Sequence, residues 1–178
     1  IIKSLNLAKE AALEAGAALI KNKITWNSPI DELQRDKKLR ADIESERILL
    51  NQLMNNSDYP VLTEETGWHG TVIKSHEKVE PDIFWIIDPL DGTINYSMNI
   101  PLCCISMALV FNGKPILGAI YDFERDELFS GGYNQGVFMN GREIETSKAV
   151  KKSDSVIMTG FPKARDFSEH SLVCFGKE

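Results

Sequence analysis

Hydrophobic side chains recur at steps of three and four residues in two stretches of the first half of the chain. Residues 2–22 carry one such stretch, and a second runs from Ala41 to about Met54. This spacing predicts two amphipathic helices, the second of which is expected to end at Asn55-Asn56-Ser57-Asp58. The apolar face of the second helix has two possible sets of members: Ile43, Arg47, Leu50 and Met54, or Ile48 and Leu53.

From Tyr59 onward the pattern changes to short runs rich in β-forming residues, which predict strands. The predicted strands are Pro60–Thr63, Ile83–Ile87, Cys103–Phe111, Pro115–Tyr121, Glu127–Ser130, Val137–Met139 and Val156–Thr159. Several are joined by tight turns at Asn112-Gly113, Arg125-Asp126 and Asn140-Gly141. Helices followed by strands with short connections predict an α+β fold with a mainly antiparallel sheet. The polar segment 66–82 is expected to be a mobile loop.

The most informative stretch reads W-I-I-D-P-L-D-G-T, an apolar run that ends at two carboxylates, Asp88 and Asp91. Pro89 has no N–H to donate and is expected to end the strand. Gly92 permits a tight turn that brings both carboxylates and the Leu90 carbonyl round one point. Such oxygen ligands suit Mg²⁺. Most isolated sequences of this kind are Asx turns between solvated carboxylates, but the apolar strand before this one favours a metal-dependent phosphate site.

Two further acidic positions are placed where they can join this site. Glu64 follows the short strand Pro60–Thr63, so neighbouring strands are expected to bring it and Asp88 to one edge of the sheet. Taken alone, the pair Glu64-Glu65 is explained more simply as a solvated turn. Asp42 lies in the first turn of the second helix, where a carboxylate either caps the helix or serves the site.

Composition narrows the class of protein. The 178 residues are 43% hydrophobic with a net charge of −6, which describes a globular chain without bulk attraction for nucleic acid. Its three cysteines include the pair Cys103-Cys104 and lack zinc-site spacing, so we expect reduced thiols and a cytoplasmic protein. Without a run of 18 apolar residues or a signal-peptide pattern, no membrane association is expected. The histidines, at positions 69, 76 and 170, share no ligand spacing and are expected on the surface.

Together these motifs resemble the inositol monophosphatase family, which comprises Mg²⁺-dependent, lithium-sensitive phosphatases related to fructose-1,6-bisphosphatase and 3′(2′),5′-bisphosphate nucleotidases. The matching elements keep the family's order: Ala41-Asp42, Thr63-Glu64-Glu65, W-x-I-D-P-L-D-G-T-x-N-Y from Trp85 to Tyr96, G-V-F-x-N-G from Gly136 to Gly141, and Thr159-Gly160-Phe161-Pro162. The resemblance implies a layered αβαβα-type sugar-phosphatase fold, with N-terminal helices packed on a mainly antiparallel sheet and the C-terminal layer incomplete. It also implies a homodimer.

The resemblance implies metal ligands as well. Glu64, Asp88 and the Leu90 carbonyl are expected to bind one Mg²⁺, and Asp88 to bridge to a second ion shared with Asp91, with two or three ions in all. In the family a downstream W-D-x-A-A-G element completes the second site, and this element is absent from the 178 residues.

A catalytic set follows from the same resemblance. Glu64 and the Thr93 hydroxyl are expected to activate the attacking water, with Asp42 polarising that hydroxyl. Asp91, Gly92 and Thr93 are expected to bind the substrate. Ala41 departs from the family pattern, because a Thr is common at that position.

These observations define the expected organisation and function. Residues 1–150 are expected to form an N-terminal α+β domain that binds metal and phosphate, and residues 151–178 the start of a C-terminal α/β domain. The expected reaction is Mg²⁺-dependent hydrolysis of a small phosphate monoester, inositol monophosphate first. The alternatives are a 3′(2′),5′-bisphosphate nucleotidase, or a non-catalytic partner-binding protein on the same fold.

Overall fold

The computed structural model describes residues 2–27, 29–33, 36–70, 81–148 and 151–156. The chain divides into two units, Ile1–Glu145 and Thr146–Glu178. The fold described below is that of the first unit. In the second unit, the described residues include one short 3₁₀ helix, Lys152–Asp154.

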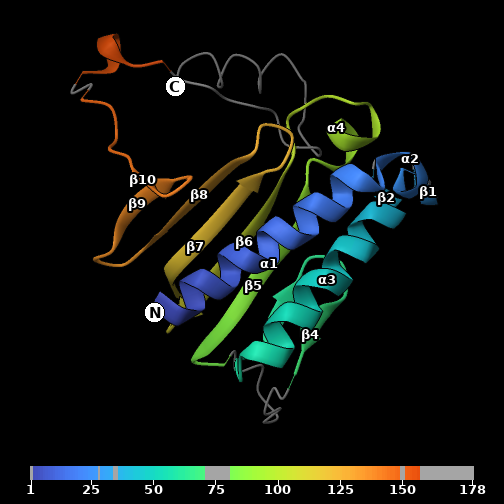
Figure 1. Ribbon diagram of the computed structural model, residues 1–178, viewed down its shortest axis with the longest axis horizontal. Helices are drawn as coiled ribbons and strands as arrows, with labels where there is room; N and C mark the ends of the chain where they lie inside the picture. Colours follow the sequence, from blue (N-terminus) through green and yellow to red (C-terminus); the bar gives the residue numbers. More distant parts are fainter. Residues whose placement is uncertain (1, 28, 34–35, 71–80, 149–150, 157–178) are drawn as a thin grey trace, which may run out of the picture. The chain divides into compact units, whose positions relative to one another are not determined.

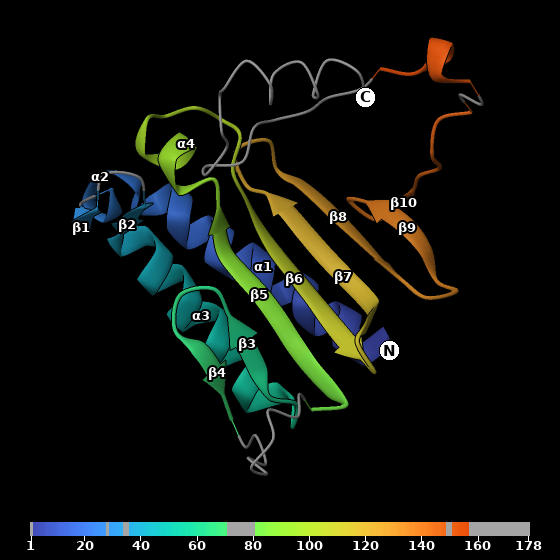
Figure 2. The ribbon, with the colours of Figure 1, turned by 180° about the vertical axis from the view of Figure 1, so that it is seen from behind.

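An eight-stranded sheet forms the centre of the first unit, in the order β10-β9-β8-β7-β6-β5-β3-β4 (Figures 1 and 2). All neighbouring strands are antiparallel except β3 and β5, which are parallel. The strands are β3 (Val61–Thr63), β4 (Gly67–His69), β5 (Ile83–Asp91), β6 (Cys104–Phe111), β7 (Lys114–Asp122), β8 (Glu127–Gly132), β9 (Gly136–Met139) and β10 (Arg142–Glu143). This confirms the predicted α+β class and mainly antiparallel sheet.

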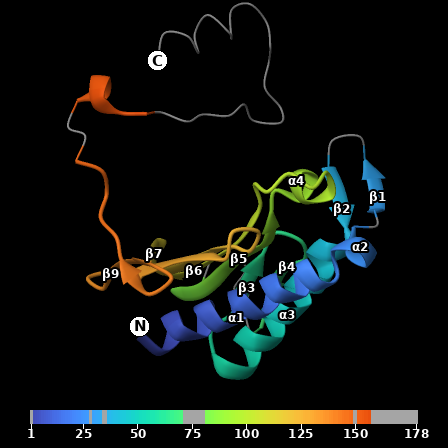
Figure 3. The same cartoon turned by 45° about the horizontal axis from the view of Figure 1, so that its top comes forward.

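Two long helices, α1 (Ile2–Lys21) and α3 (Arg40–Asn56), cover one face of this sheet (Figure 3). Between them in the sequence come the short helix α2 (Lys23–Trp26) and a hairpin of β1 (Pro29–Leu33) and β2 (Asp36–Leu39). A fourth helix, α4 (Thr93–Ser97), follows β5 directly. The described helices include none that is long and apolar enough to cross a membrane.

Small buried residues allow α1 to lie close to the sheet. Its buried face consists mainly of alanines with Leu7 and Leu19, so the helix backbone can approach the sheet. At Gly16 a Cβ atom would stand 2.4 Å from the ring of Tyr121 on β7, which leaves no room for a side chain. Above this helix lie the inward residues of β6, with Ile105 and Leu109 buried.

The face that α3 buries differs from the first set predicted. Ile43, Arg47 and Met54 are exposed, whereas the buried residues are Ala41, Asp42, Ser45, Glu46, Leu49 and Leu53. Of the second set, Leu53 is buried and Ile48 is partly buried against the core. The first set was wrong because three polar residues occupy buried positions, and a hydrophobicity pattern counts these as solvent-facing.

Two strand boundaries also need correction. β5 does not end at Pro89, because the strand resumes at Asp91 after an irregularity in its pairing with β6. A bulge of this kind tolerates a residue without an N–H. The segment expected to be a mobile loop begins with a strand, β4, while residues 71–80 lie outside the described part. In the predicted strand Val156–Thr159 only Val156 is described, and it is not in a strand.

The opposite face of the sheet carries no helix from the described part of the first unit (Figure 2). Its outward side chains include Ile86, Ile120 and Val137, which are between 42% and 51% exposed. A hollow of about 500 Å³ lies over β6 to β9 on this face, lined by residues such as Ala108 and Phe129. Exposed apolar surface of this extent promotes association.

We therefore predict that the polypeptide of residues 1–178 self-associates when produced alone. Light scattering at rising concentration should give a growing average mass. The double variant Ile86→Thr with Ile120→Thr should have a lower average mass, because both changes remove apolar surface from this face. Leu13→Thr on the exposed side of α1 is the matched control. A concentration-independent monomer would contradict the prediction.

Candidate metal centre

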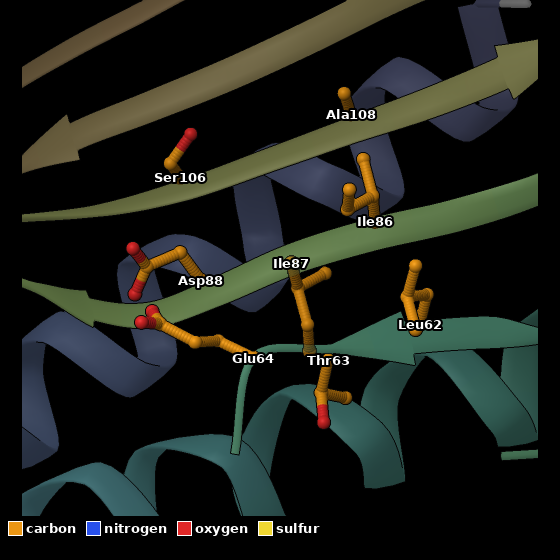
Figure 4. Close-up of a pocket in the computed structure, with 8 residues that line it drawn as sticks. All are labelled: Leu62, Thr63, Glu64, Ile86, Ile87, Asp88, Ser106 and Ala108. Atoms are coloured by element: carbon orange, nitrogen blue, oxygen red, sulfur yellow. The ribbon is translucent and has the colours of Figure 1, made fainter. Parts of the chain in front are cut away.

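The parallel pairing of β3 with β5 brings two acids together. Thr63 pairs with Ile87 in register, so the next residues, Glu64 and Asp88, are neighbours at the point where β3 ends beside β5. The Glu64 N–H donates to the Ile87 carbonyl at 3.3 Å. Figure 4 shows the two carboxylates facing one another above the sheet. The sequence prediction that neighbouring strands deliver both acids to one edge agrees with this placement.

A bulge follows Asp88. The pairing with β6 matches Asp88 to Ser106, skips two residues, and resumes with Asp91 opposite Cys104. Within the bulge the Leu90 N–H donates to Asp88 Oδ1 at 3.1 Å. This bond orients one oxygen of Asp88 and leaves the other for a further partner.

Gly92 then turns the chain into α4. Its φ of 91° lies in the left-handed region, and a Cβ atom would stand 2.7 Å from the Leu102 carbonyl oxygen. Glycine is therefore needed here for both conformation and space. The short helix is fixed from the other side, since the Tyr96 hydroxyl donates to the Leu19 carbonyl at 2.9 Å.

Asp42 and Thr93 are brought into direct contact. The Thr93 hydroxyl donates to Asp42 Oδ1 at 2.8 Å and lies 3.2 Å from the Leu90 carbonyl oxygen. Asp42 Oδ2 accepts the Leu39 N–H at 2.7 Å. The carboxylate therefore caps α3 with one oxygen and accepts from Thr93 with the other, and a role in the site stays a prediction.

The electrostatics of the site favour a cation. Burial, and next the charge of Glu64, raises the pKa of Asp88 to about 7. Burial also raises the pKa of Asp42 to about 6, against the Leu39 hydrogen bond that lowers it. A divalent cation between Glu64 and Asp88 would favour the ionised form of Asp88 and offset this cost.

The donor set fits Mg²⁺ in part. No group of three or more His, Cys, Asp or Glu side chains in the described residues is placed to hold a metal ion. A cation at Glu64 and Asp88 therefore needs a backbone oxygen, such as the Leu90 carbonyl, and water, which is usual for Mg²⁺. Burial, and next the charge of Asp91, raises the pKa of Cys104 to about 12. That thiol is therefore neutral near pH 7 and a poor metal ligand.

A hollow of about 370 Å³ opens beside the two carboxylates. It is lined by Leu62, Thr63, Glu64, Ile86, Ile87, Asp88, Ser106 and Ala108 (Figure 4). These lining residues include no Lys or Arg, so an anion placed here would depend on a bound cation for opposite charge.

The remaining sequence elements are not part of this centre as the described residues show it. The G-V-F-x-N-G element forms β9 and the turn to β10, at the far edge of the sheet from β3. Thr159-Gly160-Phe161-Pro162, His76 and His170 lie outside the described residues. Trp68 packs edge-on against Phe84, with ring centroids 5.0 Å apart.

Sequence reasoning missed the roles of four residues around Glu64 and the β5 bulge. Thr66 donates through its hydroxyl to Glu46 Oε1 at 2.6 Å, and His69 Nε2 lies 2.5 Å from the same hydroxyl. His69 was expected merely on the surface. Ser45 donates to the Pro89 carbonyl at 2.7 Å. One signal was available: Ser45 and Glu46 follow Asp42 by three and four residues, so all three share one side of a helix.

The sequence matches a known protein family over most of its length. The model of the inositol monophosphatase family matches residues 3–173. Nus factor SuhB from Xylella fastidiosa is 33% identical over 175 residues, which cover 96% of this chain and 60% of that protein. Inositol-1-monophosphatase from a Synechocystis species is 32% identical over 163 residues, which cover 88% of this chain and 53% of that protein. The chain thus spans less than two thirds of the length of either relative.

Solved structures agree with the sequence comparison. The inositol monophosphatase from Anabaena superposes with a TM-score of 0.67 at 36% identity, over 82% of this chain and 50% of that one. The SuhB protein from Bartonella henselae gives a TM-score of 0.71 at 30% identity, over 82% of this chain and 55% of that one.

The raised pKa of Asp88 predicts how pH changes stability without metal. The folded protein holds this proton more tightly than the unfolded chain, whose Asp titrates near pH 4. The contribution of Asp88 to the free energy of unfolding is therefore greatest below about pH 4 and is lost as pH rises towards about 7. Asp42 adds a loss of the same sign between about pH 4 and about 6.

Urea unfolding in EDTA, compared between the parent and Asp88→Asn across this range, measures the effect. The free energy of unfolding should fall more steeply with pH in the parent, and Mg²⁺ should restore it near pH 7. Equal slopes for parent and variant would refute the prediction.

Proposed function

The chain belongs to the inositol monophosphatase family, and we propose that its carboxylate pair binds Mg²⁺ for the hydrolysis of a small phosphate monoester. One observation carries the proposal: Glu64, directly after β3, and Asp88, within β5, face one another where the two strands run parallel. Two like charges held side by side are unfavourable unless a cation joins them. The metal set of the proposal is Glu64, Asp88 and the Leu90 carbonyl, with Asp91 towards a second ion.

Mg²⁺ in such a site supplies charge for the phosphoryl oxygens and the leaving oxygen and lowers the pKa of water. Glu64, at the edge of the hollow, is proposed to accept the proton of the attacking water. Thr93 donates its hydroxyl proton to Asp42, so its oxygen has lone pairs left to accept a hydrogen bond from that water. Asp42 acts through Thr93 and is therefore a positioning residue.

Substrate binding is proposed for the turn that follows β5. The backbone N–H groups of Gly92 and Thr93 are candidates for hydrogen bonds to the phosphate, and the exposed Asp91 for one to a substrate hydroxyl. Because α4 has only five residues, these N–H groups matter more here than a helix dipole does.

Inositol monophosphate is proposed as substrate ahead of a 3′(2′),5′-bisphosphate nucleotide, since relatives at 32% identity are named inositol-1-monophosphatase. The buried or partly buried free thiols of Cys103 and Cys104 support the proposal of a cytoplasmic protein. A homodimer is proposed from the family resemblance.

A second candidate function is a non-catalytic one. Several relatives at 29% to 33% identity carry the name Nus factor SuhB, which names no reaction. A partner-binding protein of this kind would keep the fold without needing turnover. Assay of the full-length gene product with inositol monophosphate and with adenosine 3′,5′-bisphosphate separates the candidates, because a partner-binding protein should hydrolyse neither.

For the phosphatase, Asp88→Asn should reduce kcat by about a thousandfold or more while the fold is retained, because the amide cannot supply the charge that holds the cations. Steady-state hydrolysis and circular dichroism of the full-length product measure the two effects. Asp82→Asn, a matched change at an exposed residue just before β5, should leave the rate unchanged. A rate for Asp88→Asn within about threefold of the parent would exclude this role.

Ion dependence gives a separate prediction. Activity should require Mg²⁺, and Li⁺ should inhibit because it occupies a carboxylate site with half the charge. Ca²⁺ should inhibit because it is larger and takes more ligands in a looser geometry. Rates measured with each ion at fixed ionic strength test this, with Na⁺ as the control. Full activity in EDTA would contradict it.

A further inference from the structure

We infer that α3 positions the cation site through a row of buried polar side chains, and that Ser45 and Glu46 are positioning residues for Glu64 and Asp88. The inference rests on the proposed function, since it assigns the row to a site whose cation is itself proposed.

The row consists of Asp42, Ser45 and Glu46, which are 1%, 0% and 4% exposed. Each member contacts a different segment of the site. Asp42 accepts from Thr93 on α4, Ser45 donates to the Pro89 carbonyl in the β5 bulge, and Glu46 accepts from Thr66 in the turn after Glu64. One helix face therefore reaches all three segments that carry the proposed ligands and the proposed water-binding hydroxyl.

Ser45 acts on Asp88 through one rigid peptide unit. Its hydroxyl holds the Pro89 carbonyl oxygen at 2.7 Å. In a trans peptide the carbonyl and the next N–H point in opposite directions, so this bond also fixes the direction of the Leu90 N–H. That N–H donates to Asp88 Oδ1 at 3.1 Å. The orientation of the Asp88 carboxylate is thus set from α3.

Glu46 acts on Glu64 through the turn that follows β3. Thr66 gives its hydroxyl proton to Glu46 Oε1, so the Thr63 hydroxyl, 3.2 Å from the Thr66 hydroxyl, and the ring of His69 must donate to the Thr66 oxygen. The Thr66 N–H in turn donates to the Thr63 oxygen at 3.0 Å. These bonds close the turn on itself, and Glu46 anchors it to α3.

Packing alone does not account for this row. Leu49 and Leu53 supply the apolar contacts of the same helix, and burial of polar groups is unfavourable unless each finds partners. Glu46 Oε2 has no hydrogen-bond partner among the described residues, so its burial is not fully compensated. A residue retained at such a cost is better explained by the placement of Thr66 than by stability.

The test uses the full-length gene product and two variants that each cut one connection. Ser45→Ala removes the donor to Pro89, and Thr66→Val removes the donor to Glu46 on an exposed turn, where the shape of the side chain is retained. Thr66→Ser keeps the hydroxyl and is the conservative variant. Glu44→Gln changes a residue of α3 that pairs with Arg40 and Arg47 at the surface, and is the matched control.

Two readouts are taken well below the unfolding temperature: Mg²⁺ affinity by calorimetric titration, and the Mg²⁺ concentration for half-maximal hydrolysis. Residues that orient metal ligands typically change metal affinity by about tenfold or more when removed. Ser45→Ala and Thr66→Val should each weaken Mg²⁺ binding by about that factor. Thr66→Ser and Glu44→Gln should remain within about twofold of the parent.

The outcomes separate the inference from the proposed function. If both removing variants melt earlier but bind Mg²⁺ as the parent does, the row is only structural and the inference is wrong. If Ser45→Ala does not fold, Thr66→Val decides. A parent that binds Mg²⁺ but hydrolyses neither substrate overturns the proposed function, while the affinities still decide the inference. A parent that binds no Mg²⁺ overturns both.

Discussion

Parallel pairing between β3 and β5, in a sheet that is otherwise antiparallel, is the constraint on which the site depends. Parallel strands advance in the same direction, so residues that follow a paired position on each strand remain side by side. Glu64 and Asp88 therefore share one edge although 23 residues separate them in sequence. Burial, and next the charge of Glu64, raises the pKa of Asp88. A cation held between the two carboxylates, as proposed, would offset this cost.

The polar face of α3 is the second element of this arrangement. A helix that packs on a sheet usually buries apolar residues along its whole contact face. Here Leu49 and Leu53 do so at one end, and Asp42, Ser45 and Glu46 are buried at the other. Hydrogen bonds carry direction, whereas apolar contacts tolerate small shifts. One end of the helix thus packs through apolar contacts. The other end makes directed hydrogen bonds to the segments of the candidate site.

Much of this fold could be predicted from local signals. The helix of residues 2–22 and the strands from β5 to β9 follow from periodicity, β-forming residues and turns such as Asn112-Gly113, where both residues have positive φ. The hairpin of β1 and β2 was missed because its sequence is mostly charged and lacks alternating apolar residues. The end of β5 was misplaced because Pro89 sits in a bulge, and a bulge depends on the partner strand.

The candidate site divides in the same way. Asp88, Asp91, Gly92 and Thr93 form one continuous motif, so the sequence alone makes them visible. Only their spacing from Asp42 points locally to Ser45 and Glu46, since their partners, Pro89 and Thr66, are 44 and 20 residues away. Their polarity even worked against the prediction of the buried face. The roles of these two residues become clear only once the fold shows their partners.

These separations also bear on the order in which the molecule is built. The contact between Asp42 and Thr93 closes a loop of 51 residues, and that between Ser45 and Pro89 a loop of 44. Closing long loops is slow, because chain entropy is lost before the contacts can form. Hairpins such as β6 with β7 need only short closures and can form early. During synthesis the candidate site cannot assemble until Thr93 has left the ribosome. Until then the polar row of α3 stays hydrated, because its partners have not yet been made.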